Sequence, residues 1–442
     1  MTLPVGWSAT TIRSCSNAVQ YGLTCTSSAH GGGHRYIRIT DIQDRRIDWS
    51  TVPFADVAAA QAKPYEVTKG DLLFARTGAT VGKSYLVNDN PELSVFASYL
   101  IRVRCNENVI LPEFAASYFQ SPAYWAQIVD GVGGTAQPNF NGSKLAEIKL
   151  ALPPAAEQRR IVAKLKPLTA GLDRARAELG RVPVLTDRLR NAAITSASAT
   201  LAKYPTVSVA DVAVTMFDGP FGSNLKSADY TSSGARVIRL ENIGHLNFLG
   251  DRKTYVSLTK FAALTRHTLH TGDILFSSFV DREVRVCRVP ADIDEPAINK
   301  ADCFVIRLDP TKCDGDFLTY LLGAPATYQV MKEAVHGATR PRIGLTQLKN
   351  YVFNLPPLEV QRNIAMKLDA AFARADRLEA EAARARALVD RLESAILAKA
   401  FRGELVPQDP NDEPAQVLLD RIRAERAAVP KPKRGRRAAA SA

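Results

Sequence analysis

Two stretches of this chain carry one pattern: residues 152–165 read LPPAAEQRRIVAKL, and residues 355–368 read LPPLEVQRNIAMKL. Eight of the fourteen positions are identical, at an offset of 203 residues. The match continues without a gap as far as Asp187-Arg188-Leu189 and Asp390-Arg391-Leu392. An internal repeat of this length predicts two copies of one structural unit within the chain.

The repeat extends upstream of these two stretches. KGDLLF at 69–74 matches TGDILF at 271–276 with an offset of 202, and RITDI at 38–42 matches RLENI at 239–243 with an offset of 201. So small a drift in the offset indicates short loop insertions in otherwise equivalent domains. Between these anchors the copies share little, which is typical of related scaffolds whose surfaces recognise different targets.

The first part of each copy is predicted to be a mixed α/β (α+β) globular domain. These parts, residues 1–150 and 203–353, are rich in β-branched residues, aromatic residues, glycine and turn dipeptides. We expect helices at Pro112–Phe119 and Asp316–Leu322. We expect strands at Tyr36–Ile39, Asp71–Phe74, Tyr99–Val103, Ile274–Phe276 and Cys303–Leu308.

The second part of each copy, residues 151–202 and 354–405, is predicted to be one long helix that starts after a Pro-Pro pair. Apolar residues recur there at spacings of three and four, which indicates a heptad seam. The seam of the first helix comprises Ile161, Leu165, Leu168, Leu172, Ala175, Leu179, Val182, Leu185, Leu189 and Ala193; that of the second comprises Ile364, Leu368, Ala371, Ala375, Leu378, Ala382, Ala385, Val389, Leu392 and Ile396.

A heptad seam needs a partner, and the nearest partner for each helix is the other copy. We therefore expect an antiparallel or crossed, coiled-coil-like pair, about 60 Å long for roughly 40 helical residues. The alternative is that each helix packs on its own globular domain. Pro167, Gly180 and Pro183 predict a kink or break in the first helix. Residues 406–442 are expected to form a C-terminal helix and a basic tail.

The composition of the 442 residues favours a soluble protein with a polyanionic partner. There are 57 Lys and Arg against 45 Asp and Glu, a formal charge of +12, of which five lie in the tail at Lys431–Arg437. With 46% hydrophobic residues, the chain can bury real cores. The six cysteines are not clustered as in zinc sites. Since neither a signal peptide nor an apolar span is evident, we expect a cytoplasmic protein without membrane contact.

No catalytic constellation and no metal site can be assigned from the sequence. GATVGKS at 78–84 has three residues between its glycines where a phosphate-binding loop has four, so we interpret it as a strand–turn–strand glycine pair. NLPPL at 354–358 lacks the aromatic residue of an amino-methyltransferase motif. Glu147-Ile148-Lys149 resembles only the end of a nuclease motif, and the second copy has no charge there.

Basic residues near predicted strand ends are the candidates for contact with DNA. Arginine can bind guanine through two hydrogen bonds, and both arginine and lysine pair with phosphates. Any single one of them is more often an ordinary surface residue. The candidates are Arg35, Arg38, Arg76 and Lys83 in the first domain, and Arg236, Arg239, Arg282, Arg285, Arg340 and Arg342 in the second.

The chain resembles the specificity subunit of type I restriction–modification systems. The resemblance rests on the duplicated LPP-x-x-x-QR-x-I-x-x-KL entry, on its helix, and on AFRGELVPQDPNDEPAQVLLDRI at 400–422. TGATVGK at 77–83 and GTAQPN at 134–139 are also similar to recurrent elements of that family. The similarity covers nearly the whole chain.

The resemblance implies two target-recognition domains, each reading one half of a bipartite, asymmetric double-stranded DNA sequence. The paired helices would form the spacer between them and dock two DNA methyltransferase (modification) subunits and, through these, restriction/translocase subunits. It implies that the chain binds no cofactor, and that S-adenosylmethionine, ATP and Mg²⁺ belong to its partners.

Two alternatives remain at this point. One is the specificity subunit of a related restriction–modification system without a motor. The other is a coiled-coil scaffold for protein interactions, which predicts no salt-dependent affinity for DNA.

Overall fold

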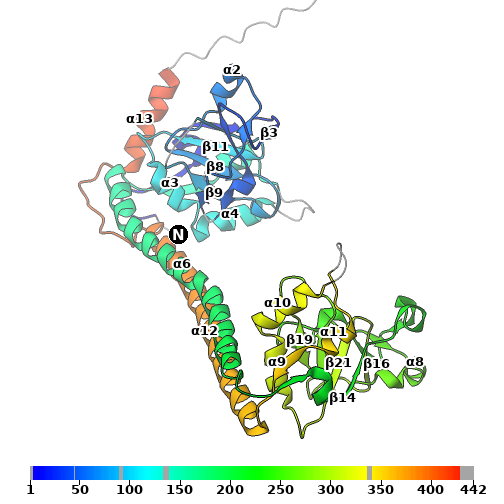
Figure 1. The fold of residues 1–442 in the computed structure, drawn as a ribbon. Helices are drawn as coiled ribbons and strands as arrows, with labels where there is room; N and C mark the ends of the chain where they lie inside the picture. Colours follow the sequence, from blue (N-terminus) through cyan, green and yellow to red (C-terminus); the bar gives the residue numbers. More distant parts are fainter. Residues whose placement is uncertain (1–2, 44, 89–92, 133–138, 336–340, 429–442) are drawn as a thin grey trace, which may run out of the picture. The chain divides into compact units, whose positions relative to one another are not determined.

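The computed structural model describes residues 3–43, 45–88, 93–132, 139–335 and 341–428 (Figure 1). Its contacts divide it into two compact units, Met1–Ala177 with Ala385–Ala442 and Glu178–Arg384. Each unit contains one mixed α/β domain and parts of both long helices, α6 (Ala155–Ala199) and α12 (Leu358–Ala400). This confirms the predicted fold class.

The first globular domain is built on two four-stranded sheets, ordered β2-β11-β8-β9 and β10-β4-β7-β3, with a β1-β12 pair beside them. Successive side chains of β8 point to opposite faces: Leu72 and Phe74 enter one apolar core, and Leu73 and Ala75 enter another. The strands are β1 Ser8–Thr11, β2 Ser16–Tyr21, β3 Ser27–Ser28, β4 Arg35–Ile37, β5 Ile42–Gln43, β6 Arg46–Ile47, β7 Phe54–Ala55, β8 Asp71–Ala75, β9 Ser84–Leu86, β10 Ser94–Phe96, β11 Leu100–Cys105 and β12 Lys149–Leu152; the helices are α1 Ile12–Cys15, α2 Ala59–Ala62, α3 Pro112–Tyr118, α4 Pro122–Val132 and α5 Gly142–Ala146.

The second domain repeats this arrangement, with sheets β14-β21-β18-β19 and β15-β17-β16-β20 and a β13-β22 pair. Ile274 and Phe276 of β18 enter one core, and Leu275 enters the other. Its strands are β13 Thr206–Ser208, β14 Ala213–Phe217, β15 Tyr230–Thr231, β16 Ala235–Ile238, β17 Tyr255–Val256, β18 Ile274–Ser277, β19 Val286–Arg288, β20 Ala297–Asn299, β21 Cys303–Leu308 and β22 Val352–Asn354; its helices are α7 Val209–Val212, α8 Leu258–Ala262, α9 Gly315–Leu322, α10 Pro325–Glu333 and α11 Leu345–Lys349.

The predicted local elements are confirmed with small shifts at their ends. The predicted strands correspond to β4, β8, β11, β18 and β21, and the predicted helices to α3 and α9. One difference is at Ile39, which starts a 3₁₀ turn (Ile39–Asp41) because Asp41 bonds back to the backbone nitrogen of Arg38. Gly78 and Gly82 both have positive φ and lie between β8 and β9, as expected of a strand–turn–strand.

The predicted break in the first helix is wrong, since α6 is one helical segment from Ala155 to Ala199. An internal proline costs about 3 kcal/mol relative to alanine, mainly through a lost hydrogen bond and a clash. Pro167, Gly180 and Pro183 all lie on exposed positions of α6, where water can satisfy the carbonyls left without a donor. Contacts with α12 stabilise the segment between the two prolines.

In each unit α6 and α12 lie side by side and antiparallel, because early residues of one contact late residues of the other (Figure 1). In the first unit, Ile161 and Leu165 share a core with Leu397. In the second, Ile194 packs with Leu368. Of the other predicted seam residues, Leu172 is buried, while Leu168, Ile364 and Ile396 are half-buried.

Part of the predicted seam is wrong. Leu189, Leu378 and Leu392 are 40%, 40% and 51% exposed, and Leu185 is exposed as well. An α-helix has 3.6 residues per turn, so a strict heptad drifts by about 20° per repeat, and the contact line moves by one position in the middle of the helices. The residues that face the partner helix there are polar or charged: Thr186, Arg190, Glu379 and Glu393.

The glutamine of each LPP…QR stretch ties a long helix to its globular domain. Buried Gln158 accepts a hydrogen bond from the backbone of Leu111 (2.9 Å) and donates to the carbonyls of Val109 (2.9 Å) and Pro153 (3.1 Å). Buried Gln361 makes the same three contacts with residues 314, 312 and 356. The repeated glutamine is therefore a structural joint.

Replacing Gln361 by leucine is expected to lower the free energy of unfolding by about 2–3 kcal/mol, because three backbone groups lose their partner. Urea unfolding followed by circular dichroism measures this. The control Gln416→Leu, at an exposed position of α13 (Ala415–Ala428), should change stability by less than about 0.5 kcal/mol. Equal effects of the two substitutions would contradict the role of Gln361.

The predicted C-terminal helix is α13, and it packs on the first domain. Ala415, Leu419 and Ile422 belong to the same core as Phe114, whose ring meets that of Phe401 at 5.2 Å. This explains why the stretch at 400–422 is rich in apolar residues at helical spacing. The basic tail at Lys431–Arg437 lies outside the described residues.

Candidate nucleic-acid interface

Four cations gather at one edge of the second globular domain. Arg239, Arg285 and Lys300 line a pocket of about 400 Å³ together with Asp302, and Arg342 reaches Asp302 at 3.5 Å. They come from different segments: Arg239 follows β16, Arg285 precedes β19, and Lys300 follows β20. We call Arg239, Arg285, Lys300 and Arg342 the second basic edge.

Neighbouring groups hold these cations in place. Arg285 donates to the carbonyl of Leu240 (3.1 Å) and to the hydroxyl of Ser277 (3.0 Å). Lys300 donates to the hydroxyl of Tyr230 at 2.5 Å, and the guanidinium of Arg342 lies 4.4 Å from the ring centre of Phe279. Arg239, which pairs with Glu241 at 3.2 Å, and Arg342 remain 38% and 43% exposed, so a ligand can still reach their guanidinium groups. Such preoriented donors suit contacts with phosphates and base edges.

Asp218 is a half-buried carboxyl next to this edge. Burial raises its pKa to about 6, helped by the nearby charge of Asp302, although the backbone nitrogen of Gly219 donates to it at 2.6 Å. A folded-state pKa above the unfolded value means that the folded protein binds the proton more tightly. Asp218 therefore lowers stability progressively as the pH rises from about 4 to about 6.

Asp218→Asn is expected to raise the free energy of unfolding by about 1–2 kcal/mol at neutral pH, after discounting for partial exposure, because it removes the cost of the buried charge. The gain should shrink as the pH falls from 6 and vanish below about 4. Urea unfolding of wild type and variant across this pH range checks the prediction. A gain that does not depend on pH would contradict it.

The first domain brings its candidates together at the equivalent place. Three backbone hydrogen bonds show which residues of the two domains are equivalent. In the first domain the nitrogen of Ala97 donates to the carbonyl of Ile37, that of Arg76 to Tyr99 and that of Ala75 to Lys83. In the second domain the same three bonds run from residue 300 to 238, from 278 to 302 and from 277 to 285. Arg38 and Lys83 thus correspond to Arg239 and Arg285. We call Arg38, Arg76, Lys83 and Tyr99 the first basic edge.

The chemistry of the two edges differs. Arg76 lies 4.9 Å from the ring centre of Tyr21, and Tyr99 is 62% exposed, whereas the second domain has Ser278, Asp218 and Asp302 at the corresponding positions. Arg38 is paired with Asp41 at 2.8 Å, and Lys83 is exposed. At these corresponding positions the first domain has two tyrosines and the second has two aspartates, so the two edges can recognise different base edges.

Two of the other candidates are structural. Arg236 is only 2% exposed and donates to the carbonyls of Gly250 (3.3 Å) and Arg252 (2.7 Å), so its prediction as a DNA contact is wrong: it supports the backbone that follows β16. Its equivalent Arg35 is half-buried and donates to the carbonyl of Val52. Arg282 is exposed, and Arg340 lies outside the described residues.

Lys300 is not among the residues predicted from the sequence. Its counterpart in the first copy is Ala97, so the repeat gave no signal, and only the parallel pairing of β16 with β20 places Lys300 beside Arg239. The local sequence does not reveal that β16 and β20 pair, because the two strands are about 60 residues apart.

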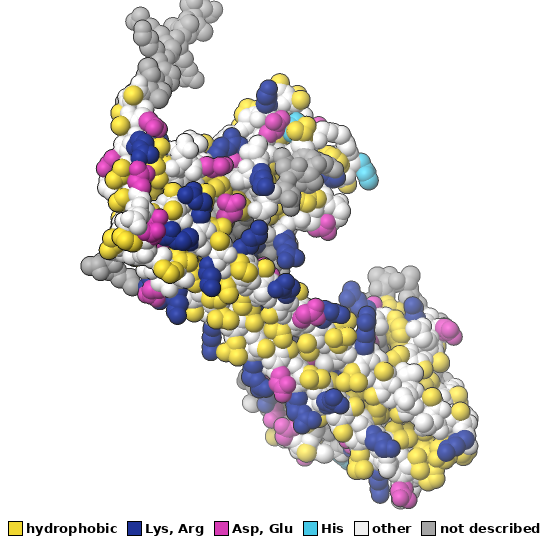
Figure 2. All heavy atoms as spheres, turned by 90° about the vertical axis from the view of Figure 1, so that its left-hand side faces the viewer, with side chains coloured by type: hydrophobic (Ala, Val, Ile, Leu, Met, Phe, Trp, Pro, Cys, Tyr) yellow, Lys and Arg dark blue, Asp and Glu magenta, His cyan; other side chains and the backbone are white. Residues whose placement is uncertain are grey.

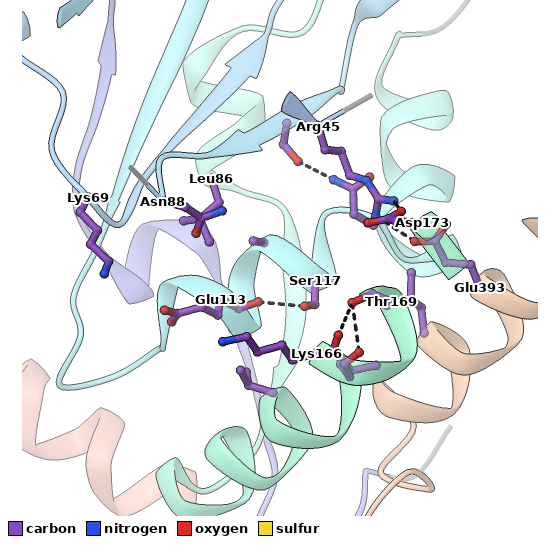
Figure 3. A pocket seen from close by; sticks show the side chains of 16 residues that line it. Arg45, Lys69, Leu86, Asn88, Glu113, Ser117, Lys166, Thr169, Asp173 and Glu393 are labelled. Carbon is purple, nitrogen blue, oxygen red and sulfur yellow. Dashed lines mark hydrogen bonds and ion pairs between the residues drawn. The ribbon is translucent and has the colours of Figure 1, made fainter. Parts of the chain in front are cut away.

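A larger pocket of the first unit, about 590 Å³, lies where the globular domain meets α6 and α12 (Figure 3). Arg45, in the turn between β5 and β6 and with φ of 62°, points to Asp173 (2.9 Å) and Glu393 (2.8 Å). Lys69, Lys166 and Glu113 also line the pocket. Since Arg45 is bound on both sides, this pocket is a junction between domain and helices.

The described part of the chain shows no group of three or more His, Cys, Asp or Glu side chains arranged for a metal ion. All six cysteines are free, and burial raises the pKa of the Cys15 thiol to about 11. Within the same residues, no helix has both the length and the hydrophobicity needed to cross a bilayer.

Two related domains, each with a basic edge, form an arrangement that would suit recognition of nucleic acid. A family model described as the type I restriction modification DNA specificity domain matches residues 27–179 and 266–384. The chain therefore belongs to the family of type I restriction–modification DNA specificity subunits. Its globular domains are target-recognition domains.

Individual members of this family are similar in sequence to most of the chain. It is 26% identical to the specificity subunit of the StySPI enzyme of Salmonella potsdam, over 88% of both chains. It is also 26% identical to the EcoKI specificity subunit of Escherichia coli (strain K12), over 89% of this chain and 88% of that one. A solved chain from a study of complex assembly and conformational transition of the type I R-M system has a similar fold, with a TM-score of 0.72 and 21% identity, covering 92% of this chain and 100% of that one.

Proposed function

We propose that this chain recognises a bipartite, asymmetric double-stranded DNA sequence, with the first basic edge reading one half and the second basic edge the other. The observation that carries the proposal is that equivalent edges of two duplicated domains hold accessible cations on different chemical backgrounds: Tyr21 and Tyr99 in one, Asp218 and Asp302 in the other. Different backgrounds favour different half-sites, and therefore an asymmetric target.

The helix pair is proposed to act as the spacer and to dock the partner subunits. Five leucines of the two helices are exposed: the predicted seam residues Leu185, Leu189, Leu378 and Leu392, and also Leu388. Hydrophobic side chains are visible among lysines and arginines on the face shown in Figure 2. Exposed apolar rows of this kind are typical of protein interfaces. We assign them to two DNA methyltransferase subunits, through which restriction/translocase subunits would assemble.

In this proposal the chain performs no chemistry and binds no cofactor. S-adenosylmethionine, ATP and Mg²⁺ would be bound by the methyltransferase and restriction partners, and the complex would act on DNA in the cytoplasm. A methyltransferase complex without a motor subunit is the second candidate, since it would use the same DNA-reading domains and the same docking of methyltransferase subunits.

Methylation-resolved sequencing of the source genome, with and without this gene, tests the proposal. We expect N6-methyladenine to disappear from one split motif with an unspecified gap. Retained methylation at every motif, with the methyltransferase expressed, would contradict it. Loss at a continuous motif would contradict the bipartite reading.

A further inference from the structure

Two clusters of charged residues lie between the long helices, one in each unit. In the first unit, Arg176 of α6 binds Glu393 (2.5 Å) and Asp390 (2.8 Å) of α12. In the second unit, Arg190 of α6 binds Glu379 (2.7 Å) and Asp376 (2.6 Å) of α12. We call them the first and the second ion-pair cluster. In both clusters the contacts between the helices join an arginine of α6 to carboxylates of α12. Each arginine also pairs with an aspartate of α6 itself, Asp173 (3.4 Å) or Asp187 (3.1 Å), and Arg45 binds Glu393 as described above.

The internal repeat relates the two clusters to each other. At the offset of 203, Arg176 corresponds to Glu379, and Arg190 corresponds to Glu393. The aspartates of the clusters are the same in both copies, because Asp390 corresponds to Asp187 and Asp376 to Asp173. At the two positions that face each other across the helix pair, the two copies therefore carry opposite charges.

The apolar contacts cannot tell the two helices apart. Ile161 and Leu165 of α6 correspond to Ile364 and Leu368 of α12, and these residues are similar in size and position. By its apolar residues alone, each helix could pair with the same helix of a second copy of this chain. The charged positions remove that ambiguity.

Pairing of α12 with another α12 would place Glu379 opposite Glu393 and next to Asp390, where α6 otherwise supplies an arginine; Arg45 would remain beside Glu393. Pairing of α6 with another α6 would place Arg176 opposite Arg190. These side chains are largely shielded from water, with exposures of 20% for Arg176, 17% for Arg190, 14% for Glu393 and 36% for Glu379. Like charges repel more strongly where water is displaced. The hydrogen bond from Arg190 also lowers the pKa of Glu379, which keeps this carboxylate ionised.

We infer that the two ion-pair clusters specify the partner of each long helix: they select α6 with α12 and exclude pairs of the same helix from two copies of this chain. The partner that fits α6 is a helix with glutamates at both facing positions. The inference rests on the helix contacts alone and does not depend on the proposed DNA target.

Two double variants of the full chain test the inference. Arg190→Glu/Glu379→Arg reverses one ion pair and keeps opposite charges facing each other. Arg176→Glu/Glu379→Arg puts a carboxylate at position 176 opposite Glu393 and a guanidinium at position 379 opposite Arg190. In pairs of the same helix, by contrast, the carboxylate at position 176 would meet Arg190, and the guanidinium at position 379 would meet Glu393. Both variants exchange one arginine and one glutamate, so composition and net charge are identical.

We expect Arg190→Glu/Glu379→Arg to have a Tm close to that of the wild type. Pairs of the same helix would also bring opposite charges together in this variant, but it should remain monomeric because the two helices of one chain keep both ion pairs and meet at a much higher effective concentration than helices of two chains. Arg176→Glu/Glu379→Arg should have a Tm lower by about 3–6 °C and should form dimers as its concentration rises. Thermal unfolding and light scattering after size-exclusion chromatography measure both properties. Raising the salt concentration should reduce the difference in Tm.

Equal Tm values and equal masses of the two variants would overturn the inference. If Arg176→Glu/Glu379→Arg yields only aggregate, two milder double variants are compared instead: Arg176→Gln/Glu379→Arg and Arg190→Gln/Glu379→Arg. Again the variant that leaves Arg190 facing the introduced guanidinium at position 379 should be the less stable. A failure of this test would leave the DNA proposal intact, because methylation patterns measure that proposal separately.

Discussion

The variant Arg239→Ala/Lys300→Ala is expected to bind target DNA about 10- to 100-fold more weakly than the wild type, because it removes two cations of the second basic edge. The logarithm of affinity should also fall less steeply with the logarithm of salt concentration, by about 1–2 in slope, since fewer counterions are released on binding. The affinity and its salt dependence are measured by fluorescence anisotropy at several salt concentrations, with a DNA duplex that contains the motif identified by methylation-resolved sequencing.

The matched control is Lys203→Ala/Lys312→Ala, which removes two cations from the place where the same domain joins the helices. Both lysines are exposed, and Lys312 pairs weakly with Asp309 (4.0 Å). The control should reduce affinity by less than about threefold, as expected for charges distant from the DNA. Equal losses in the two double variants would mean that the second basic edge acts only through net charge, which would contradict its assignment.

Replacing Asp71 by asparagine is expected to reduce the free energy of unfolding by about 3–5 kcal/mol. Asp71 is 1% exposed and accepts two hydrogen bonds from Arg104 (2.8 Å each) and one from the backbone of Thr68 (3.0 Å). It also faces Arg102 at 3.5 Å, whose side chain is 4% exposed and whose pKa is lowered by burial. Without Asp71, the charge of Arg102 stays buried without a carboxylate, which is costly.

The internal repeat supplies the comparison for this prediction. Asp273 corresponds to Asp71 and binds Arg307 (2.6 Å), but the position of Arg102 is occupied by Val305. Asp273→Asn should therefore cost less, about 1–2 kcal/mol, because no second buried guanidinium is left unpaired. Urea unfolding followed by tryptophan fluorescence and circular dichroism measures both variants. An equal or larger loss for Asp273→Asn would disprove the role assigned to Arg102.

Local patterns predicted the strands and the long helices well. β8, β11, β18 and β21 were recognisable because short runs of β-branched and aromatic residues are bounded by turn residues. α6 and α12 were recognisable because a spacing of three and four extends over about ten turns. The error at Pro167 and Pro183 arose because helix propensity ignores exposure, and both prolines lie on the side that faces water.

The candidate site was predicted only in part. Arg38, Arg76, Lys83, Arg239 and Arg285 were recognised as basic residues near strand ends, and the structure brings them to equivalent edges. Arg236 looked the same in sequence but is buried. Whether an arginine on a strand points to a carbonyl or to solvent depends on which segment crosses above it, and a single strand does not contain that information.

The duplication alone determined that the chain holds two related domains and two related helices, since repeated local patterns fold in the same way wherever they occur. The tertiary structure determined how the two copies differ in their contacts. Which strands pair, which arginines are buried and which helix faces meet all depend on segments distant in sequence, as Arg176 and Glu393 illustrate. Heptad spacing predicted a helix pair, but an α-helix turns slightly more slowly per residue than a heptad requires. In the middle of the pair, charged residues therefore take the place of the leucines at the contact.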